Sequence, residues 1–310
     1  MLYEYQVATS QDSSYILDEI NHRLRWLQEK GFSLNVDALV NDELSRTYNL
    51  KLLGENLDNV FREEDIIYIF KHQMSEVLAE HIIKDWEKKL LWKEVIRSSK
   101  GYTAKERNII YEKANEFLKC CNNNESLDLL MKFGRKNRIA HKILDHINNS
   151  DIIVIEGFIN FCMQDYLTEI RFAVDIAVEE LNNEKEYNEF VKLLRFFVDS
   201  QVPKSYEVNL MMDNKGLFYI WDAEGLTIEE TYMDYYLNDM LLDENNLDDI
   251  LISILITIAP RRIILHNVLE YTDNEAVKTI FKVFHEKINI CNGCERCYDL
   301  FLKDDKDRKN

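Results

Sequence analysis

The chain has 310 residues, which is enough for a sizeable core in one or two domains. Its 46% hydrophobic and 30% charged residues are typical of a soluble globular protein. Its first residues lack the apolar stretch of a signal peptide, so we expect a cytoplasmic location and no membrane insertion. The net charge of −18 disfavours binding to nucleic acids. With 2 Pro and 8 Gly, the chain has few helix breakers, which favours a mainly helical protein.

The N-terminal part is predicted to form strand, helix, strand and strand in that order. Residues 2–9 alternate between polar and apolar side chains and are rich in tyrosine, which indicates a strand. Residues 16–30 carry apolar side chains at helical spacing, and Gly31 follows where a helix C-cap favours a positive φ. Residues 32–39 and 46–53 are predicted as two further strands.

The next part, up to about residue 147, is predicted to be helical. One helix start is marked by Thr103 and Glu106, which stand three residues apart in the relation of a capping box.

The stretch from residue 156 to residue 204 is predicted to be a long helical hairpin. The turn-favouring pair Asn182–Asn183 interrupts its apolar pattern, and Pro203 closes the second helix. Its apolar stripe is wide enough to contribute much of the core. One face of the first helix carries Phe158, Cys162, Tyr166, Ile170, Ala173, Ala177 and Leu181.

Beyond Pro203 the pattern changes to alternating strands and helices. A β-hairpin is predicted first, followed by two helices that alternate with two strands. This order indicates a mixed sheet with crossover connections. The predicted elements are strands 206–212 and 217–221, helix 247–259, strand 262–266, helix 274–285 and strand 287–290.

These elements together predict an α+β fold that is mainly helical. We expect an N-terminal α/β unit at 1–56, a helical region at 57–203 and a C-terminal α/β unit at 204–298, all of which could pack as one domain. The charged tail 303–310 is expected to be disordered.

Two long runs of the chain carry a resemblance to a known family. The first is EGFINFCMQDYLTEI followed by EKEYNEFVKLLRFFVDSQVPKSYEVNLMM, and the second is LDDILISILITIAPRRIILHN. Both runs resemble the YtxC family (YtxC-like), whose members are associated with sporulation. The two runs cover roughly the C-terminal half, whereas the N-terminal half matches in length and layout. The resemblance implies a role in endospore-forming bacteria. It supplies no catalytic residue to transfer to this chain.

The strongest chemical motif is Cys291-Asn-Gly-Cys294-Glu-Arg-Cys297. Two thiolates separated by a tight Gly turn can face one Zn²⁺, and C-x₂-C-x₂-C also matches part of an iron–sulfur ligand run. Either site requires a fourth ligand. The candidates are His285, His266, Cys162, the pair Cys120–Cys121 and a second chain. The alternative is that these are free thiols near a chain end.

Two further features are candidate functional positions. His266 ends a predicted strand, where ligand-contacting residues are common, although a structural histidine is the simpler interpretation. A basic patch, which no acidic residue interrupts, either docks a phosphate-bearing ligand or an acidic partner, or forms a solvated helix face that pairs with acidic residues of the same chain. It consists of Lys132, Arg135, Lys136, Arg138 and Lys142.

The chain contains no phosphate-binding loop, dinucleotide fingerprint, H-E-x-x-H motif or nucleophile elbow, which favours a protein that is not an enzyme. We therefore expect a cytoplasmic, sporulation-associated protein that acts through protein partners. The alternative hypothesis is a metal-binding protein, with zinc or an iron–sulfur cluster, or a redox-responsive protein that uses the C-terminal cysteines.

Overall fold

The computed structural model describes residues 1–10, 14–41, 46–54, 62–119, 125–212, 218–228, 247–267 and 274–297. It is mainly helical and contains two mixed sheets of four strands each, which confirms the predicted α+β class. The contacts divide the chain into two compact units, Met1–Asn182 and Asn183–Asn310.

The first unit contains a sheet with the strand order β2-β3-β1-β4. The strands are β1 (Tyr3–Thr9), β2 (Phe32–Asn41), β3 (Arg46–Gly54) and β4 (Ile152–Val154). β3 pairs antiparallel with both β1 and β2, and β4 adds to β1 in parallel. The first three strands confirm the predicted ones. β4 was not predicted, because a strand of three residues is too short to show alternation.

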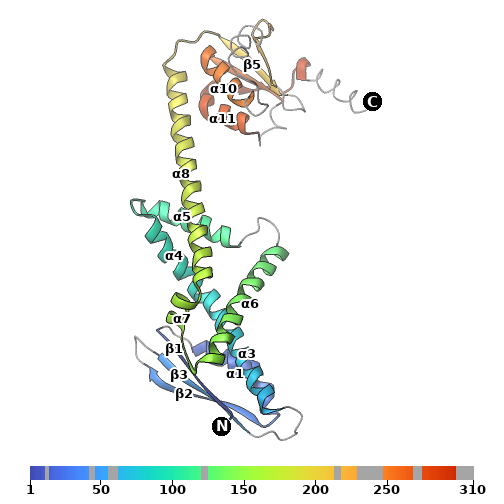
Figure 1. Cartoon of the computed structure of the whole chain (residues 1–310). Coiled ribbons are helices and arrows are strands. Elements are labelled where there is room, and N and C mark those ends of the chain that lie inside the picture. Colours follow the sequence, from blue (N-terminus) through green and yellow to red (C-terminus); the bar gives the residue numbers. More distant parts are fainter. Residues whose placement is uncertain are drawn as a thin grey trace. The chain divides into compact units, whose positions relative to one another are not determined.

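Helices pack on this sheet and form the core of the first unit (Figure 1). The predicted first helix is split into α1 (Ser14–Arg23) and α2 (Arg25–Gln28), and Gly31 has the expected positive φ, of 89°. The helix α3 (Glu63–His81) buries Ile66, Phe70 and Met74 completely and continues through a π-helical turn, η1 (Ile82–Trp86).

The remaining helices before β4 are α4 (Glu87–Ser98), α5 (Ala104–Lys119) and α6 (Glu125–Asn149). The predicted capping box is present at the start of α5. The backbone N–H of Thr103 donates to Glu106 Oε2 at 2.7 Å, and the backbone N–H of Glu106 donates to Thr103 Oγ1 at 3.3 Å. This reciprocal pair satisfies two amide donors at the helix N-terminus.

The predicted helical hairpin is wrong. A short helix, α7 (Ile155–Cys162), is followed by one continuous helix, α8 (Gln164–Ser200), which runs through Asn182 and Asn183. Asparagine costs at most about 0.7 kcal/mol relative to alanine inside a helix, so two of them do not end it without Gly or Pro. The Asn182 side chain also accepts a hydrogen bond from the Tyr102 hydroxyl at 2.7 Å, so its polar group is satisfied within the helix.

The second unit contains a sheet with the order β6-β5-β7-β8. Its elements are β5 (Glu207–Met212), β6 (Phe218–Asp222), α10 (Leu247–Ile258), β7 (Arg262–His266), α11 (Glu275–Phe284) and β8 (Ile288–Ile290). β5 and β6 form the predicted hairpin, whereas β5, β7 and β8 run parallel. The carboxyl ends of β7 and β8 therefore meet at the same edge of the sheet.

The two-unit division does not decide whether 1–56, 57–203 and 204–298 fold independently, so that division stays a prediction. The tail 303–310 lies outside the described residues. Among the helices that the structure describes, none is both long enough and apolar enough to cross a membrane.

Replacing Thr103 with Ala removes one half of the capping box. We expect a loss of about 1 kcal/mol in the free energy of unfolding of the first unit, because the amide of Glu106 loses its acceptor. Urea denaturation followed by circular dichroism measures this loss. Thr103→Ser keeps the hydroxyl and serves as the matched control, and an unchanged midpoint for Thr103→Ala would contradict the capping role.

Candidate metal centre

Four potential metal ligands converge at the carboxyl edge of the second sheet. His266 is the last residue of β7, and Cys291 directly follows β8. The backbone N–H of Cys291 donates to the carbonyl of Leu265 at 2.8 Å, which holds the segment after β8 against the end of β7. Cys294 and Cys297 follow after a turn at Gly293, whose φ is 109°. We call His266, Cys291, Cys294 and Cys297 the His–Cys₃ cluster.

The ligand atoms of the His–Cys₃ cluster all lie within 4.8 Å of one another. The Sγ atom of Cys297 is 4.0 Å from that of Cys291 and 3.6 Å from that of Cys294. The Nδ1 atom of His266 is 3.4 Å from Cys294 Sγ and 3.5 Å from Cys297 Sγ.

These distances match the edges of a tetrahedron around one zinc ion. With Zn–S bonds of about 2.3 Å, two sulfurs of a tetrahedral site lie about 3.8 Å apart. With a Zn–N bond of about 2.0 Å, a nitrogen and a sulfur lie about 3.5 Å apart. The four residues thus fit a single tetrahedral ion.

The orientation of the His266 ring is set by Asn209 on β5. The Asn209 amide nitrogen donates to the backbone carbonyl of Asp222 at 3.3 Å and to Glu207 Oε1 at 3.4 Å, so its carbonyl oxygen Oδ1 faces the histidine. Oδ1 lies 3.0 Å from His266 Nε2 and can only accept, so Nε2 carries the proton. Nδ1 then presents a lone pair to the sulfurs, which is the form that binds a metal.

The members of the cluster differ in how readily they ionise. Burial, followed by the charge of Arg296, lowers the pKa of His266, which keeps the ring neutral. Burial raises the pKa of Cys297 to about 11, and the neighbouring sulfurs of Cys294 and Cys291 oppose a second thiolate beside them. Burial also opposes ionisation of Cys294, but hydrogen bonds, among them those from the backbone amides of Cys297 and Arg296, lower its pKa overall. A divalent cation would remove the repulsion between adjacent thiolates.

An aromatic and a cationic side chain cover the cluster. The ring centroids of Trp221 and His266 are 5.0 Å apart. The guanidinium carbon of Arg296 lies over the Trp221 ring, 4.9 Å from its centroid. Gly225 allows this arrangement, because a Cβ atom there would lie 2.5 Å from Arg296 Nη2, and its φ is 86°. His266 and Cys297 are each 6% exposed, whereas Cys291 and Cys294 are partly exposed, so one side of the cluster is shielded from water.

The structure separates the fourth-ligand candidates. His266 joins the three cysteines, whereas His285 is exposed in a 3₁₀ turn (His285–Lys287) and is not part of the cluster. Cys162 is an exposed free thiol of α7 in the first unit. Cys120 and Cys121 lie outside the described residues.

Sequence reasoning missed Asn209, Trp221 and Arg296 as supporting residues. For Asn209 a signal was available, because an amide in the otherwise apolar run Val208–Met212 needs a buried hydrogen-bond partner.

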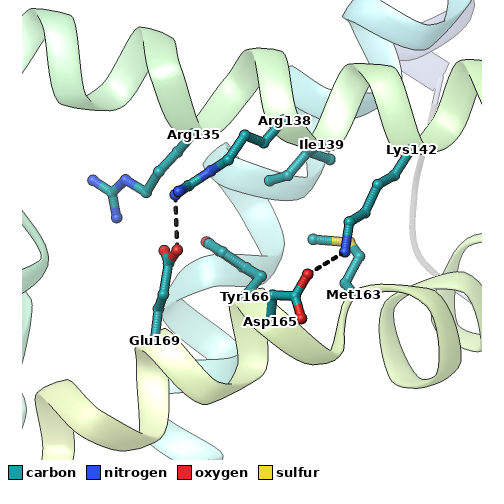
Figure 2. A pocket seen from close by; sticks show the side chains of 8 residues that line it. All are labelled: Arg135, Arg138, Ile139, Lys142, Met163, Asp165, Tyr166 and Glu169. Carbon is teal, nitrogen blue, oxygen red and sulfur yellow. Dashed lines mark hydrogen bonds and ion pairs between the residues drawn. The ribbon is translucent and has the colours of Figure 1, made fainter.

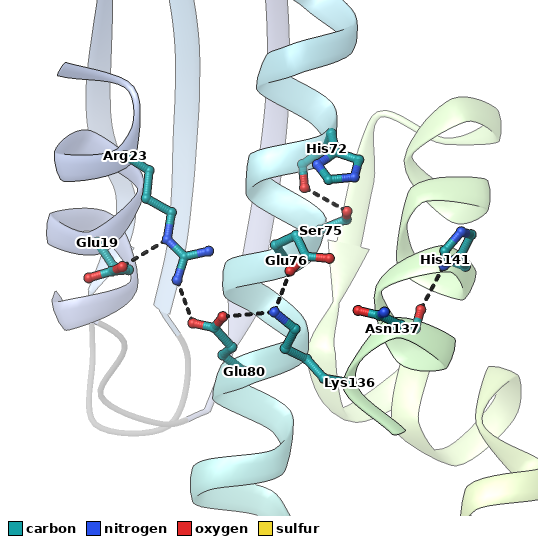
Figure 3. Close-up of polar contacts among 9 residues, drawn as sticks. All are labelled: Glu19, Arg23, His72, Ser75, Glu76, Glu80, Lys136, Asn137 and His141. Atoms are coloured by element: carbon teal, nitrogen blue, oxygen red, sulfur yellow. Dashed lines mark hydrogen bonds and ion pairs between the residues drawn. The ribbon is translucent and has the colours of Figure 1, made fainter. Parts of the chain in front are cut away.

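The predicted basic patch lies on α6. Lys136 forms ion pairs with Glu76 at 2.6 Å and with Glu80 at 3.3 Å, and Glu80 also binds Arg23 of α1 at 2.6 Å (Figure 3). These contacts link α1, α3 and α6. Lys132 is exposed and forms no ion pair with a described residue.

The other three residues of the basic patch line a small pocket of about 120 Å³ between α6 and the start of α8 (Figure 2). Four of the five patch residues thus have acidic partners in the same chain. The role of the patch in binding a ligand or partner stays a prediction. The three ion pairs are Arg135–Glu87 at 3.3 Å, Arg138–Glu169 at 2.8 Å and Lys142–Asp165 at 2.7 Å.

Comparison with known proteins identifies a family whose pattern the chain matches. A model of the YtxC-like family matches residues 72–289. The chain is also 26% identical over 161 residues to "Uncharacterized protein YtxC" of Bacillus subtilis (strain 168), a match that covers 52% of this chain and 56% of that protein. The match thus spans just over half the length of this relative. No solved structure matches. The family match includes Asn209 and His266 and ends before Cys291.

Replacing Asn209 with Ala removes the acceptor that orients His266. We expect zinc affinity to fall by about 10- to 100-fold, because a metal-bound histidine that loses its outer hydrogen bond also loses its fixed orientation. Competition with a chromophoric chelator measures the affinity. The control is Asn289→Ala, which removes an exposed asparagine of β8. Equal affinity for Asn209→Ala and wild type would exclude this orienting role.

Proposed function

The chain belongs to the YtxC-like family, and we propose that it is a zinc-binding protein whose His–Cys₃ cluster holds one structural zinc ion. The observation that carries this proposal is the agreement between the four ligand-atom separations and a single tetrahedral ion. The fixed Nε2–H tautomer of His266 supports it independently.

Zinc fits the cluster better than an iron–sulfur cluster does. The ligands of an iron–sulfur cluster bind different iron atoms and are therefore spread around its whole inorganic core. Here the four ligand atoms lie within 4.8 Å of one another, which leaves room for one ion. Four protein ligands also complete the coordination of zinc, as in structural sites, so no position remains for a substrate or an activated water.

The zinc ion would act as a cross-link within the second unit. β8 has three residues and is largely exposed, so it buries little apolar surface to stabilise its own position. A metal bound by His266 of β7 and by the three cysteines after β8 would fix this edge of the sheet. Because such a site does not exist in the unfolded chain, its binding energy would become folding energy.

We also propose that the protein acts in the cytoplasm through protein partners during sporulation, and not as an enzyme. The family membership and the closed coordination of the zinc site support this proposal.

The zinc proposal is tested by metal analysis of protein purified without added metal. We expect one zinc ion per chain in wild type and none in a variant with Cys291, Cys294 and Cys297 changed to Ser. Chelation is expected to lower the thermal midpoint of the second unit by about 10 °C or more, because a loss of several kcal/mol shifts a domain of this size by a few degrees per kcal/mol.

The control is Cys162→Ser, which removes an exposed thiol of the first unit and should leave the zinc content unchanged. Metal-free wild-type protein with the same midpoint before and after chelation would overturn the proposal. If the protein instead contains iron and absorbs visible light, and the triple variant has lost both, the cysteines hold an iron–sulfur cluster and not zinc.

The biological proposal is tested in the organism that encodes this chain. A strain carrying the triple Cys→Ser allele should yield fewer heat-resistant spores than the strain carrying Cys162→Ser, with equal growth before sporulation. Equal spore yields would show that the three cysteines are not needed for sporulation.

A further inference from the structure

The N-terminal half of α6 carries apolar side chains that the first unit leaves exposed. Leu130, Met131 and Phe133 are 65%, 47% and 55% exposed. Two aromatic residues of neighbouring helices, Phe117 of α5 and Phe172 of α8, are 40% and 56% exposed and contact each other with ring centroids 5.8 Å apart. A concentration of exposed apolar side chains of this kind marks an interaction site more often than a plain surface.

Hollows lie on both sides of this part of α6. One, of about 480 Å³, is bounded by α5, α6 and the start of α8, and Phe117, Leu130 and Phe172 line it. The other, of about 840 Å³, is bounded by α3, η1, α4, α5 and α6, and Ile83, Tyr111 and Phe133 contribute its apolar lining. We call the exposed apolar side chains Leu130, Met131 and Phe133 of α6, together with the two hollows, the α6 surface.

Gly134 stands in the middle of the α6 surface. A glycine inside a helix is destabilising relative to alanine, so its presence requires a reason. No described atom lies within 4 Å of the place where its Cβ would be, so packing within the described chain does not require a glycine there. A close approach by another backbone at Gly134 would supply the reason, as small residues do where two helices cross closely.

The charge around the α6 surface is basic in a chain whose net charge is −18. Arg135, Lys136 and Arg138 already have acidic partners in the same unit. Lys88, Lys119 and Lys132 line the hollows, are exposed and form no ion pair with any described residue, whereas Glu112 is the one acidic residue of this lining without such a partner. A partner that docks here would meet unpaired positive charge at the rim of an apolar surface.

We propose that the α6 surface docks an acidic amphipathic helix of another protein. Its apolar face would enter the hollow between Phe117, Leu130 and Phe172, and its backbone would pass close to Gly134. Its carboxylates would face Lys132 and the lysines of the second hollow. The proposal rests on the partner-binding part of the proposed function and is independent of the zinc site, because all of its residues belong to the first unit.

The positive charge around the α6 surface distinguishes an acidic helix from the other possible occupants, which are a second copy of this chain and a nucleic acid. A helix with glutamates around an apolar stripe would satisfy both the exposed apolar side chains and the unpaired lysines. A second copy of this chain would bring a further net charge of −18 and would not supply a preferentially acidic helix without long-range repulsion. A nucleic acid would bind the lysines through its phosphates but would leave the apolar side chains of the α6 surface exposed.

The test uses a fluorescein-labelled peptide of about 16 residues, long enough to form a helix, with leucines on one face and glutamates on the other. Binding to the full-length protein is followed by fluorescence anisotropy. We expect saturable binding that weakens as salt rises, and we expect no binding of a control peptide with lysine in place of each glutamate.

Gly134→Glu is the decisive variant. Its side chain enters open space, so the fold should be retained and the thermal midpoint should rise, because glutamate is a better helix former than glycine. Binding of the acidic peptide should nevertheless weaken by about tenfold or more. Leu130→Ser should weaken binding as well. Phe161→Ser, which removes an 81% exposed apolar side chain of α7, should not.

Three outcomes would overturn the proposal. The first is that the acidic peptide fails to bind, or that the basic peptide binds equally well. The second is equal affinity for wild type and Gly134→Glu. The third is a wild-type dimer, seen by sedimentation, that Leu130→Ser dissociates, because the α6 surface would then belong to a second copy. Zinc content measured on each variant keeps a failure here separate from a failure of the zinc site.

Discussion

The candidate metal centre of the second unit depends on one hydrogen bond, between His266 Nε2 and the carbonyl oxygen of Asn209. This bond fixes the tautomer, and the tautomer directs the lone pair of Nδ1 toward three sulfurs that arrive from the segment after β8. The parallel pairing of β7 and β8 brings His266 and Cys291 to the same edge, and the Gly293 turn returns the chain so that Cys294 and Cys297 face them. The sheet thus builds the site, and a bound ion would in turn stabilise the sheet.

The two units balance charge in different ways. In the first, cationic side chains of α6 are neutralised by acidic residues of other helices, as in the chain of contacts from Glu76 through Lys136 and Glu80 to Arg23 (Figure 3). Isolated pairs of this kind contribute little at an exposed surface, but a network with half-buried members fixes the register of three helices. In the second unit, a cation bound by the His–Cys₃ cluster would balance the charge of its thiolates.

Much of the fold was predictable because its signals are local. Alternation marked the strands, Gly31 marked a positive φ, and Thr103 with Glu106 marked a helix start. The continuity of α8 was missed because Asn182–Asn183 resembles a turn, although asparagine alone costs too little to end a helix. The hydrogen bond from Tyr102 then satisfies the Asn182 side chain within that helix. The three cysteines were readable as possible ligands, but the choice between His266 and His285 depends on which strand end lies beside β8. That choice is made by sheet topology, which sequence spacing does not encode.

The most direct measurement of the proposed zinc site is X-ray absorption spectroscopy at the zinc edge on the full-length protein purified without added metal. The predicted spectrum has three sulfur neighbours at about 2.3 Å and one nitrogen neighbour at about 2.0 Å. The His266→Ala variant should lose the nitrogen neighbour and retain the three sulfurs. A zinc shell of oxygen and nitrogen atoms, or protein without zinc, would contradict a structural centre formed by His266, Cys291, Cys294 and Cys297.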